Sequence, residues 1–456
     1  MADKLGVSTD RPANPSKGLM PKETVVTIEA RTIRQVMWRV MPLLTLSYFV
    51  AFLDRINISV AALTMNKDLG FSPGMFGFGA GLFFLSYFFF EVPSNVLLQK
   101  FGARRWIARI MFSWGIVSGA MAFVHGQFGF YALRLLLGVA EAGFFPGVLF
   151  YLSYWFPEIY RGRVFAYFLA SVPLSSVIGF PISAALLGMD GLWGMHGWQW
   201  LFIIEALMAV LLSVVVFYCL TDYPRDAKWL STEQRGWLEH RLVLEAERRQ
   251  GARGTGVWVA LMNPRVLGFC IIHFCTNLAL YGFGFFLPQI VKPFGLSNLQ
   301  TGFVAAVPFV LGALGMVYWG RRADHFSRRW SILIPMALAA LGFAGAAAFS
   351  NPYWMLASMS LASFGLLGYS PVFWTLPTAV LAGAAAAVAI AAINSVGNLA
   401  GFFGPTIVGY LRDLTGSYST GLAASAAVLV VAWVLTAWLT REPPSLAPAE
   451  IAERKA

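Results

Sequence analysis

The segment Trp38–Met65 reads WRVMPLLTLSYFVAFLDRINISVAALTM, a largely apolar run that carries an aspartate and an arginine near its middle. A helix needs roughly 20 mostly apolar residues to cross the hydrocarbon core of a bilayer, which is about 30 Å thick. The segment meets that requirement, and similar runs recur along nearly the whole chain. The sequence therefore predicts a membrane protein built from spanning helices.

The overall composition indicates the same class of protein. Of the 456 residues, 58% are hydrophobic and 12% are charged, and the mean hydropathy is +0.66. A soluble domain carries about 25% charged residues, and strands of an outer-membrane barrel would alternate polar and apolar residues. We expect an all-α membrane protein with twelve transmembrane helices. The predicted spans are Trp38–Met65, Met75–Leu98, Arg105–Val124, Phe128–Trp155, Val164–Leu187, Trp198–Leu220, Pro264–Val291, Thr301–Trp319, Trp330–Phe349, Tyr353–Leu381, Ala385–Leu411 and Thr420–Leu439.

Basic residues gather on one side of this map. An even number of spans places both ends of the chain on the same side, and most of the 33 Lys and Arg residues fall there. A few of the remaining Lys and Arg residues lie inside predicted spans, and Lys67, Lys292 and Arg412 fall on the other side. By the positive-inside rule we expect a multi-pass protein of the cell membrane, the inner membrane of a bacterium, with both termini cytoplasmic. Topology thus explains most of the net charge of +11, and we expect no nucleic-acid partner.

The polar stretches divide the chain into two halves. The longest internal one separates six spans from six, and its capping-box spacing after Ser231 predicts an amphipathic helix that ties the halves together. The predicted parts are a disordered cytoplasmic tail at 1–35, six-helix bundles at 36–221 and 264–440, a cytoplasmic linker at 222–263 and a cytoplasmic tail at 441–456.

Four ionisable residues of the predicted spans lie at similar depth. Asp54 and Arg55 lie about 16 Å from the outer end of the first span, near the bilayer midplane. Arg134 and Glu141 lie about 10 and 20 Å below the outer surface, and their spacing of seven residues places them on one face of the fourth span. Charges are costly in hydrocarbon, so those that occur there usually face a cavity or pair with each other.

These four residues fit the binding of an anion together with protons. An arginine can hold a carboxylate through two parallel hydrogen bonds, and a buried carboxyl group can have a pKa that responds to its surroundings. We predict that Arg55 and Arg134 bind substrate and that Asp54 and Glu141 couple transport to protons. The alternative is that Asp54–Arg134 and Arg55–Glu141 are buried pairs that only neutralise each other.

Two loops on the predicted cytoplasmic side repeat a pattern about half a chain apart. Asn95–Arg104 reads NVLLQKFGAR and Gly320–Arg329 reads GRRADHFSRR. Here the sequence resembles the major facilitator superfamily, whose loop signature is GxxxD(R/K)xGRR. The resemblance implies two pseudo-symmetric six-helix bundles and a conformational role for the loops, although clustered arginines also serve simply as topology signals. The matching positions are Gly102, Arg104, Gly320, Asp324, Arg328 and Arg329, while the first copy has Asn95 and Gln99 where the signature has Gly and Asp.

Further motifs resemble one branch, the anion:cation symporter family, which carries organic acids with protons. They are DRINIS at Asp54–Ser59, RLLLGVAEAG at Arg134–Gly143, FWTLP at Phe373–Pro377 and NSVGNLAGF at Asn394–Phe402. The stretches 222–230 and 287–300 resemble members that take up tartrate-like or aromatic acids. The resemblance implies import of an organic anion by proton symport with alternating access. The sequence contains no GxxxxGK[ST] loop for ATP, so an ion gradient would drive accumulation.

The second half has no acidic or basic residue clearly inside a predicted span, so we expect it to supply polar and aromatic contacts. The predicted ligands are Tyr87 of the second span and, in the second half, Gln289, Trp374, Asn394 and Asn398. Further candidates in the second half are Asn277, Tyr281 and Ser370. Packing is the alternative role for the aromatic residues. For Glu91, Glu205 and His273 both a structural and a functional role remain open.

The expected partners are a small-molecule organic anion, protons and the lipid bilayer, and we expect a monomer without metal or cofactor. The sequence contains neither HExxH nor GxSxG, so we do not expect an enzyme. An organic-anion exchanger or exporter on the same fold is the alternative function. The substrate stays open among a tartrate-like dicarboxylate, a sugar acid and an aromatic carboxylate.

Overall fold

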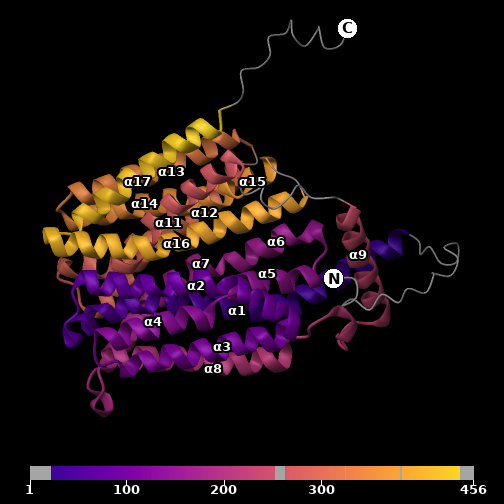
Figure 1. The fold of residues 1–456 in the computed structure, drawn as a ribbon, viewed down its shortest axis with the longest axis horizontal. Helices are drawn as coiled ribbons and strands as arrows, with labels where there is room; N and C mark the ends of the chain where they lie inside the picture. Colours follow the sequence, from indigo (N-terminus) through magenta and orange to yellow (C-terminus); the bar gives the residue numbers. More distant parts are fainter. Residues whose placement is uncertain (1–21, 252–261, 324, 381–382, 442–456) are drawn as a thin grey trace, which may run out of the picture.

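The computed structural model describes residues 22–251, 262–323, 325–380 and 383–441, and these are almost entirely helical. Figure 1 shows long helices lying side by side in two stacks, one from each half of the chain. The first half contains α1 Lys22–Leu69, α2 Pro73–Phe101, α3 Ala103–Ala120, α4 Gln127–Glu141, α5 Phe144–Trp155, α6 Glu158–Leu169, α7 Ser171–Leu186 and α8 Gly197–Cys219, followed by α9 Thr232–Gly251. The second half contains α11 Pro264–Val291, α12 Asn298–Ala323, α13 Arg328–Ala348, α14 Pro352–Phe373, α15 Thr375–Val380, α16 Gly383–Thr415 and α17 Ser419–Leu439.

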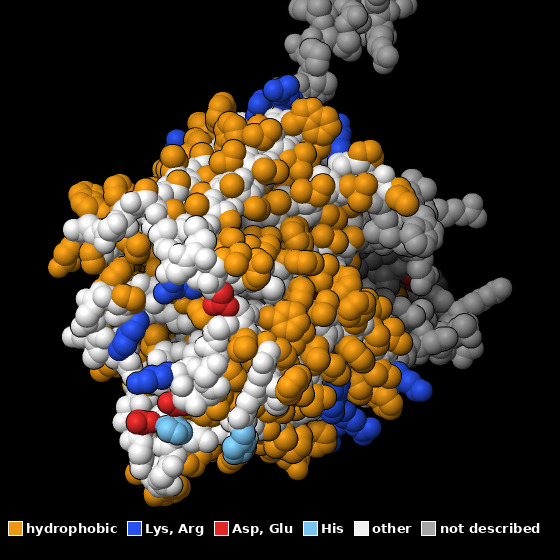
Figure 2. Space-filling model, turned by 60° about the vertical axis from the view of Figure 1, so that its left-hand side comes forward, with side chains coloured by type: hydrophobic (Ala, Val, Ile, Leu, Met, Phe, Trp, Pro, Cys, Tyr) orange, Lys and Arg blue, Asp and Glu red, His pale blue; other side chains and the backbone are white. Residues whose placement is uncertain are grey.

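The helices confirm the predicted spans. Within the described residues, 11 helical stretches are long and apolar enough to cross a membrane, with α4 and α5, α6 and α7, and α14 and α15 each contributing to a single stretch. The 33-residue α16 corresponds to the remaining predicted span. Apolar side chains cover most of the face shown in Figure 2. Such a surface suits lipid, because soluble monomers rarely expose contiguous apolar patches of more than a few hundred Å².

The first helix begins earlier than the sequence predicted. Because α1 starts at Lys22, residues 22–35 continue the helix, and the prediction of a disordered tail is wrong for them. The rest of that tail and the tail 442–456 lie outside the described residues.

The linker helix α9 confirms the predicted cap. The backbone N–H of Ser231 donates to Gln234 Oε1 at 3.0 Å, and the Gln234 N–H donates to Ser231 Oγ at 3.2 Å. Gln35 of α1 accepts a hydrogen bond from the Gln234 amide at 3.0 Å. The linker is therefore held against the first half, and α9 marks the side of the molecule that the sequence predicts to be cytoplasmic (Figure 1).

The halves meet closely on the side opposite α9. Asp413 at the end of α16 accepts hydrogen bonds from Ser72 Oγ at 2.7 Å and from the backbone N–H of Gly74 at 2.9 Å, at the start of α2. Further along the same pair of helices, Gly77 lies directly against the backbone of Pro405. These contacts close the molecule at this end, and they leave the centre of the interface for the site described next.

Candidate functional site

The four predicted charges of the site lie on two helices of the first half, and a helix break positions one of them. Asp54 and Arg55 lie within the uninterrupted α1. Glu141 is the last residue of α4, because Ala142 leaves helical geometry and Gly143 adopts a φ of 83°. This left-handed conformation favours glycine, and a Cβ there would also meet Ser94 of α2. The sequence AEAG thus places a carboxyl group at a bend in the fourth span.

Arg55 and Glu141 form a buried ion pair. Arg55 Nε donates to Glu141 Oε1 at 2.8 Å, and Nη2 donates to the same oxygen at 2.5 Å. The Glu141 side chain is 0% exposed and that of Arg55 is 12% exposed. No donor among the described residues reaches Glu141 Oε2. Arg55 is the more accessible partner, so a ligand would meet the cation first.

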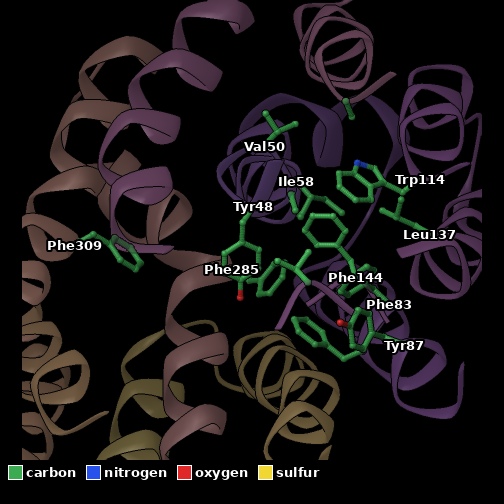
Figure 3. Packing of buried hydrophobic residues seen from close by; sticks show 14 of the residues in the cluster. Tyr48, Val50, Ile58, Phe83, Tyr87, Trp114, Leu137, Phe144, Phe285 and Phe309 are labelled. Atoms are coloured by element: carbon green, nitrogen blue, oxygen red, sulfur yellow. The ribbon is translucent and has the colours of Figure 1, made fainter. Parts of the chain in front are cut away.

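Aromatic rings surround the guanidinium of Arg55. Its central carbon lies 5.0 Å from the ring centroid of Phe52, 5.3 Å from that of Phe83 and 5.3 Å from that of Tyr87. Figure 3 shows Phe83 and Tyr87 close together within the first half. Such cation–π contacts stabilise the guanidinium and restrict its orientation. The structure thus brings the predicted ligand Tyr87 next to Arg55.

Arg134 and Asp54 do not pair with each other. Arg134 Nη2 donates to the Ala80 carbonyl oxygen at 2.9 Å. Asp54 Oδ1 accepts hydrogen bonds from Asn57 Nδ2 at 3.1 Å and from Ser118 Oγ. Within the described part of the chain, neither charge has an ion-pair partner within 4.0 Å. Of the two neutralising pairs that the sequence left open, the structure contains only Arg55–Glu141 among the described residues.

A cavity lies beside Arg55, between the two halves. Its lining comes from α1, α2 and α7 of the first half and from α11, α12 and α14 of the second, and among the described residues Arg55 is the only charged member of this lining. Ser59 and Ser176 add hydroxyl groups, and most of the remaining lining is aromatic or aliphatic. Figure 3 shows two of the rings, Phe285 and Phe309, on separate helices. The lining therefore combines one cation, the hydroxyl-bearing residues Ser59, Ser176 and Tyr281, and apolar walls.

The predicted ligands of the second half do not gather at this cavity. Gln289 lies near the end of α11 opposite α9, where its Oε1 accepts hydrogen bonds from Tyr418 at 3.1 Å and from Asn66 of α1 at 3.5 Å. It contributes to the closed end of the molecule, and the structure does not bring it to the cavity. The lining instead includes Tyr281, whose ring centroid lies 4.5 Å from that of Phe84.

Three other predicted ligands lie nearer the α9 side. Trp374 follows the end of α14 and contacts His273, with ring centroids 5.0 Å apart. Asn398 of α16 lies within hydrogen-bonding reach of Glu91 of α2, so these two residues join the halves. Asn394 is half-buried on α16. None of these residues belongs to the cavity lining.

Other lining residues carried no usable signal in the sequence. Phe180, Phe285 and Phe309 line the cavity, but the chain contains 39 phenylalanines. Only the packing of the helices separates lining rings from core rings.

The two loop motifs differ in structure as they differ in sequence. Gly102 ends α2 with a φ of 90°, and the backbone N–H of Arg104 donates to Asp222 Oδ1 at 2.7 Å. Asp222 follows α8, and its carboxylate lies near the start of α3. The first loop motif itself has Gln99 where the signature has Asp.

In the second copy, Gly320 lies in α12, Arg328 is exposed, and Arg329 Nη2 donates to the Ala437 carbonyl oxygen at 3.5 Å. Asp324 lies outside the described residues.

Two helical bundles around a cavity with a buried charge pair are the architecture of a membrane transporter. The family model of the Major Facilitator Superfamily matches residues 44–288 and 269–456. The chain belongs to the major facilitator superfamily, as its sequence predicted. Members of this class are transporters and not enzymes, so the chain is a transporter.

Relatives with assigned names span nearly the whole chain. Two proteins of Agrobacterium vitis, each named "Putative tartrate transporter", are 49% identical over 93% of this chain and 95% of the relative, and 50% identical over 91% and 96%. A quinolone resistance transporter of Acinetobacter baumannii is 42% identical over 90% of this chain and 94% of its own. The tartrate-related names are consistent with the organic-anion branch.

Solved structures agree on the fold. The xylose transporter XylE from E. coli, in a partially occluded inward open conformation, superposes with a TM-score of 0.72 at 16% identity, covering 91% of this chain and 100% of that one. At this identity the likeness shows the fold alone.

Proposed function

We propose that the protein imports an organic anion together with protons, by alternating access of a site between its two halves. The observation that carries this proposal is the ion pair between Glu141 and the cavity-lining Arg55. The names of the Agrobacterium vitis relatives support an organic acid as the substrate. We further propose that the protein works as a monomer in a bacterial inner membrane, with both termini in the cytoplasm.

The pair can couple the two ligands through competition. A substrate carboxylate that binds Arg55 must share the guanidinium with Glu141. A proton on Glu141 removes the competing negative charge, and without that proton a buried carboxylate would lose its charge partner, which is strongly destabilising. Anion and proton therefore bind favourably together. When both have left, the re-formed Arg55–Glu141 pair neutralises the site and allows the empty protein to reorient.

The test is the replacement Glu141→Gln in purified protein reconstituted into vesicles. We expect accumulation driven by an imposed pH gradient to fall at least about tenfold, because Gln cannot exchange a proton. Counterflow, in which internal substrate exchanges for labelled external substrate, should persist, because Arg55 remains. Asp226→Asn, which neutralises a largely exposed carboxylate outside the spans, is the matched control and should behave as the unmodified protein. Normal accumulation together with normal counterflow in Glu141→Gln would overturn the coupling role of Glu141.

The choice of acid is tested with a panel of tartrate, a sugar acid and an aromatic carboxylate. Each class offers a carboxylate to Arg55, but the classes differ in what else must be accommodated. Hydroxyls and a second carboxylate need polar partners, whereas an aromatic ring is accommodated by walls such as Phe285 and Phe309. Uptake of none of these acids under an inward proton gradient would contradict the proposed substrate class.

An exchanger or exporter of organic anions is the second candidate. The relative named as a quinolone resistance transporter supports this candidate, because its name gives no indication of uptake of an organic acid. An exchanger would show stimulation of uptake by substrate on the opposite side of the membrane, without stimulation by an inward proton gradient. The same vesicles therefore separate the two candidates.

A further inference from the structure

Another buried carboxyl group of the first half, outside the cavity lining, is Glu205 on α8. Glu205 is 1% exposed, its Oε1 accepts a hydrogen bond from Ser183 Oγ of α7 at 2.6 Å, and no donor among the described residues reaches its Oε2. It faces the interior of the first half and not lipid. Asp54 Oδ2 is likewise buried without a donor in the described part of the chain.

Asn57 interacts with both carboxyl groups. It donates to Asp54 Oδ1 at 3.1 Å, and its amide lies near Glu205, whose Oε1 is hydrogen-bonded to Ser183. Its side-chain amide carries two N–H groups, so it can donate one to each carboxyl. With Ser118 and Ser183, these residues form a closed polar cluster drawn from α1, α3, α7 and α8. We call these five residues the carboxyl cluster.

The carboxyl cluster is short of positive charge. Among the described residues, the ionisable groups that interact with Asp54 are Glu141 and Arg134 of α4 and Glu205 of α8. The other members do not titrate in the physiological range. Among the described residues no cation lies within 4.0 Å of either carboxyl group.

Two negative charges cannot be held together in such a place. An unpaired buried carboxylate costs several kcal/mol, and two of them in one site raise that cost further, so that one proton is shared between them. Three neutral donors can stabilise one negative charge, but not two. The two carboxyl groups of the carboxyl cluster can therefore carry one negative charge between them, so that one proton stays bound while a second can be exchanged.

We propose that Asp54 and Glu205 form one shared proton-binding site, bridged by Asn57 and separate from the pair at Arg55. This proposal rests on proton coupling as the proposed function. Removing the charge of Glu205 relieves Asp54 of a negative neighbour, so its proton leaves more easily. Removing the Ser183 donor destabilises the charged form of Glu205, so the cluster holds its proton more firmly.

The experiment measures proton-driven uptake against external pH in vesicles, and the release of protons on substrate addition to purified protein in weak buffer. The substrate is the acid that the panel shows to be transported. For Glu205→Gln we expect the pH of half-maximal uptake to fall by roughly half a unit or more, with fewer protons exchanged per substrate. For Ser183→Ala we expect the midpoint to rise. Counterflow at saturating substrate reports folding and binding in both variants.

Opposite shifts distinguish a shared proton site from general damage, which would move both variants in the same direction. The matched control is Ser213→Ala, which removes another buried serine hydroxyl of α8 outside the carboxyl cluster and should leave the midpoint unchanged. If the pH midpoint of uptake and the number of protons exchanged are both unchanged in Glu205→Gln, the inference is overturned. It is also overturned if a sodium gradient drives uptake and Glu205→Gln abolishes this sodium dependence. Uptake by the unmodified protein that does not depend on pH would instead overturn the proposed function.

Discussion

Arg55 meets the cavity with a guanidinium that is already held in place. Three aromatic rings lie within 5.3 Å of its central carbon, and Glu141 binds its Nε and Nη2. A lysine could satisfy the charge but not the fork of donors or the flat contact with the rings. Arg134 is more deeply buried, at 2% exposed, and it donates to a backbone carbonyl and does not line the cavity. The two arginines are therefore not equivalent in this conformation.

We predict that Arg55→Lys raises the substrate concentration for half-maximal counterflow about tenfold or more, because one charge-assisted hydrogen bond contributes about 1.5–3 kcal/mol. Arg134→Lys should raise it less. Both values are measured in the same vesicles, after gel filtration has shown that each variant is monodisperse. A larger effect of Arg134→Lys would mean that the substrate binds the other arginine.

At the scale of elements, the contact between α2 and α16 closes the end opposite α9. Glycines allow the two helices to approach so closely that an added Cβ on Gly77, Gly81 or Gly409 would meet backbone atoms of the facing helix. Asp413 adds two hydrogen bonds at the start of α2, where a negative charge also complements the helix dipole.

We predict that Gly77→Val prevents closure at this end, because the side chain would overlap the backbone of Pro405. A cysteine placed at Asn66, in a background where the exposed Cys219 is replaced by serine, should react faster with a water-soluble maleimide. Proton-driven uptake should fall at least about tenfold, since each transport cycle requires closure.

The control for this experiment is Gly188→Val at the same end of the molecule, where a Cβ would meet nothing within 4 Å. It should change neither the reaction rate nor uptake. Unchanged reactivity together with normal uptake in Gly77→Val would show that this contact does not close the molecule.

At the scale of the whole molecule, the two halves share a fold but not a chemistry. The buried charges and the carboxyl cluster all lie in the first half, while the second half adds Tyr281, Phe285 and Phe309 to the cavity. In the proposed mechanism, protons would be exchanged within the first half, and the second half would contribute apolar lining that moves relative to the first.

We predict that α9 faces the cytoplasm. A cysteine at Gly236 of α9 should react with an impermeant maleimide only after cells are permeabilised, whereas one at Gly188 should react in intact cells. Both glycines have open space around them, so neither cysteine should disturb the fold. Reaction at Gly236 in intact cells and not at Gly188 would reverse the proposed topology.

The sequence alone determined the class of fold and the depth of its charges. Hydrophobic length and helix caps are local properties, so the predicted spans agree with the helices to within a few residues at most ends, and Pro264–Val291 agrees at both. Residues 22–35 were missed because their polar side chains resemble a tail, although they continue α1.

Only the tertiary structure decided which charges meet. Depth along a helix does not fix its rotation, so the sequence could not tell that Arg55 pairs with Glu141 while Asp54 is held by Asn57 and Ser118. The proximity of Asn57 on the first span to Glu205 on the sixth likewise depends on how those helices pack. Contacts between residues far apart in the chain are set by packing, because no local pattern records which faces of two helices will touch.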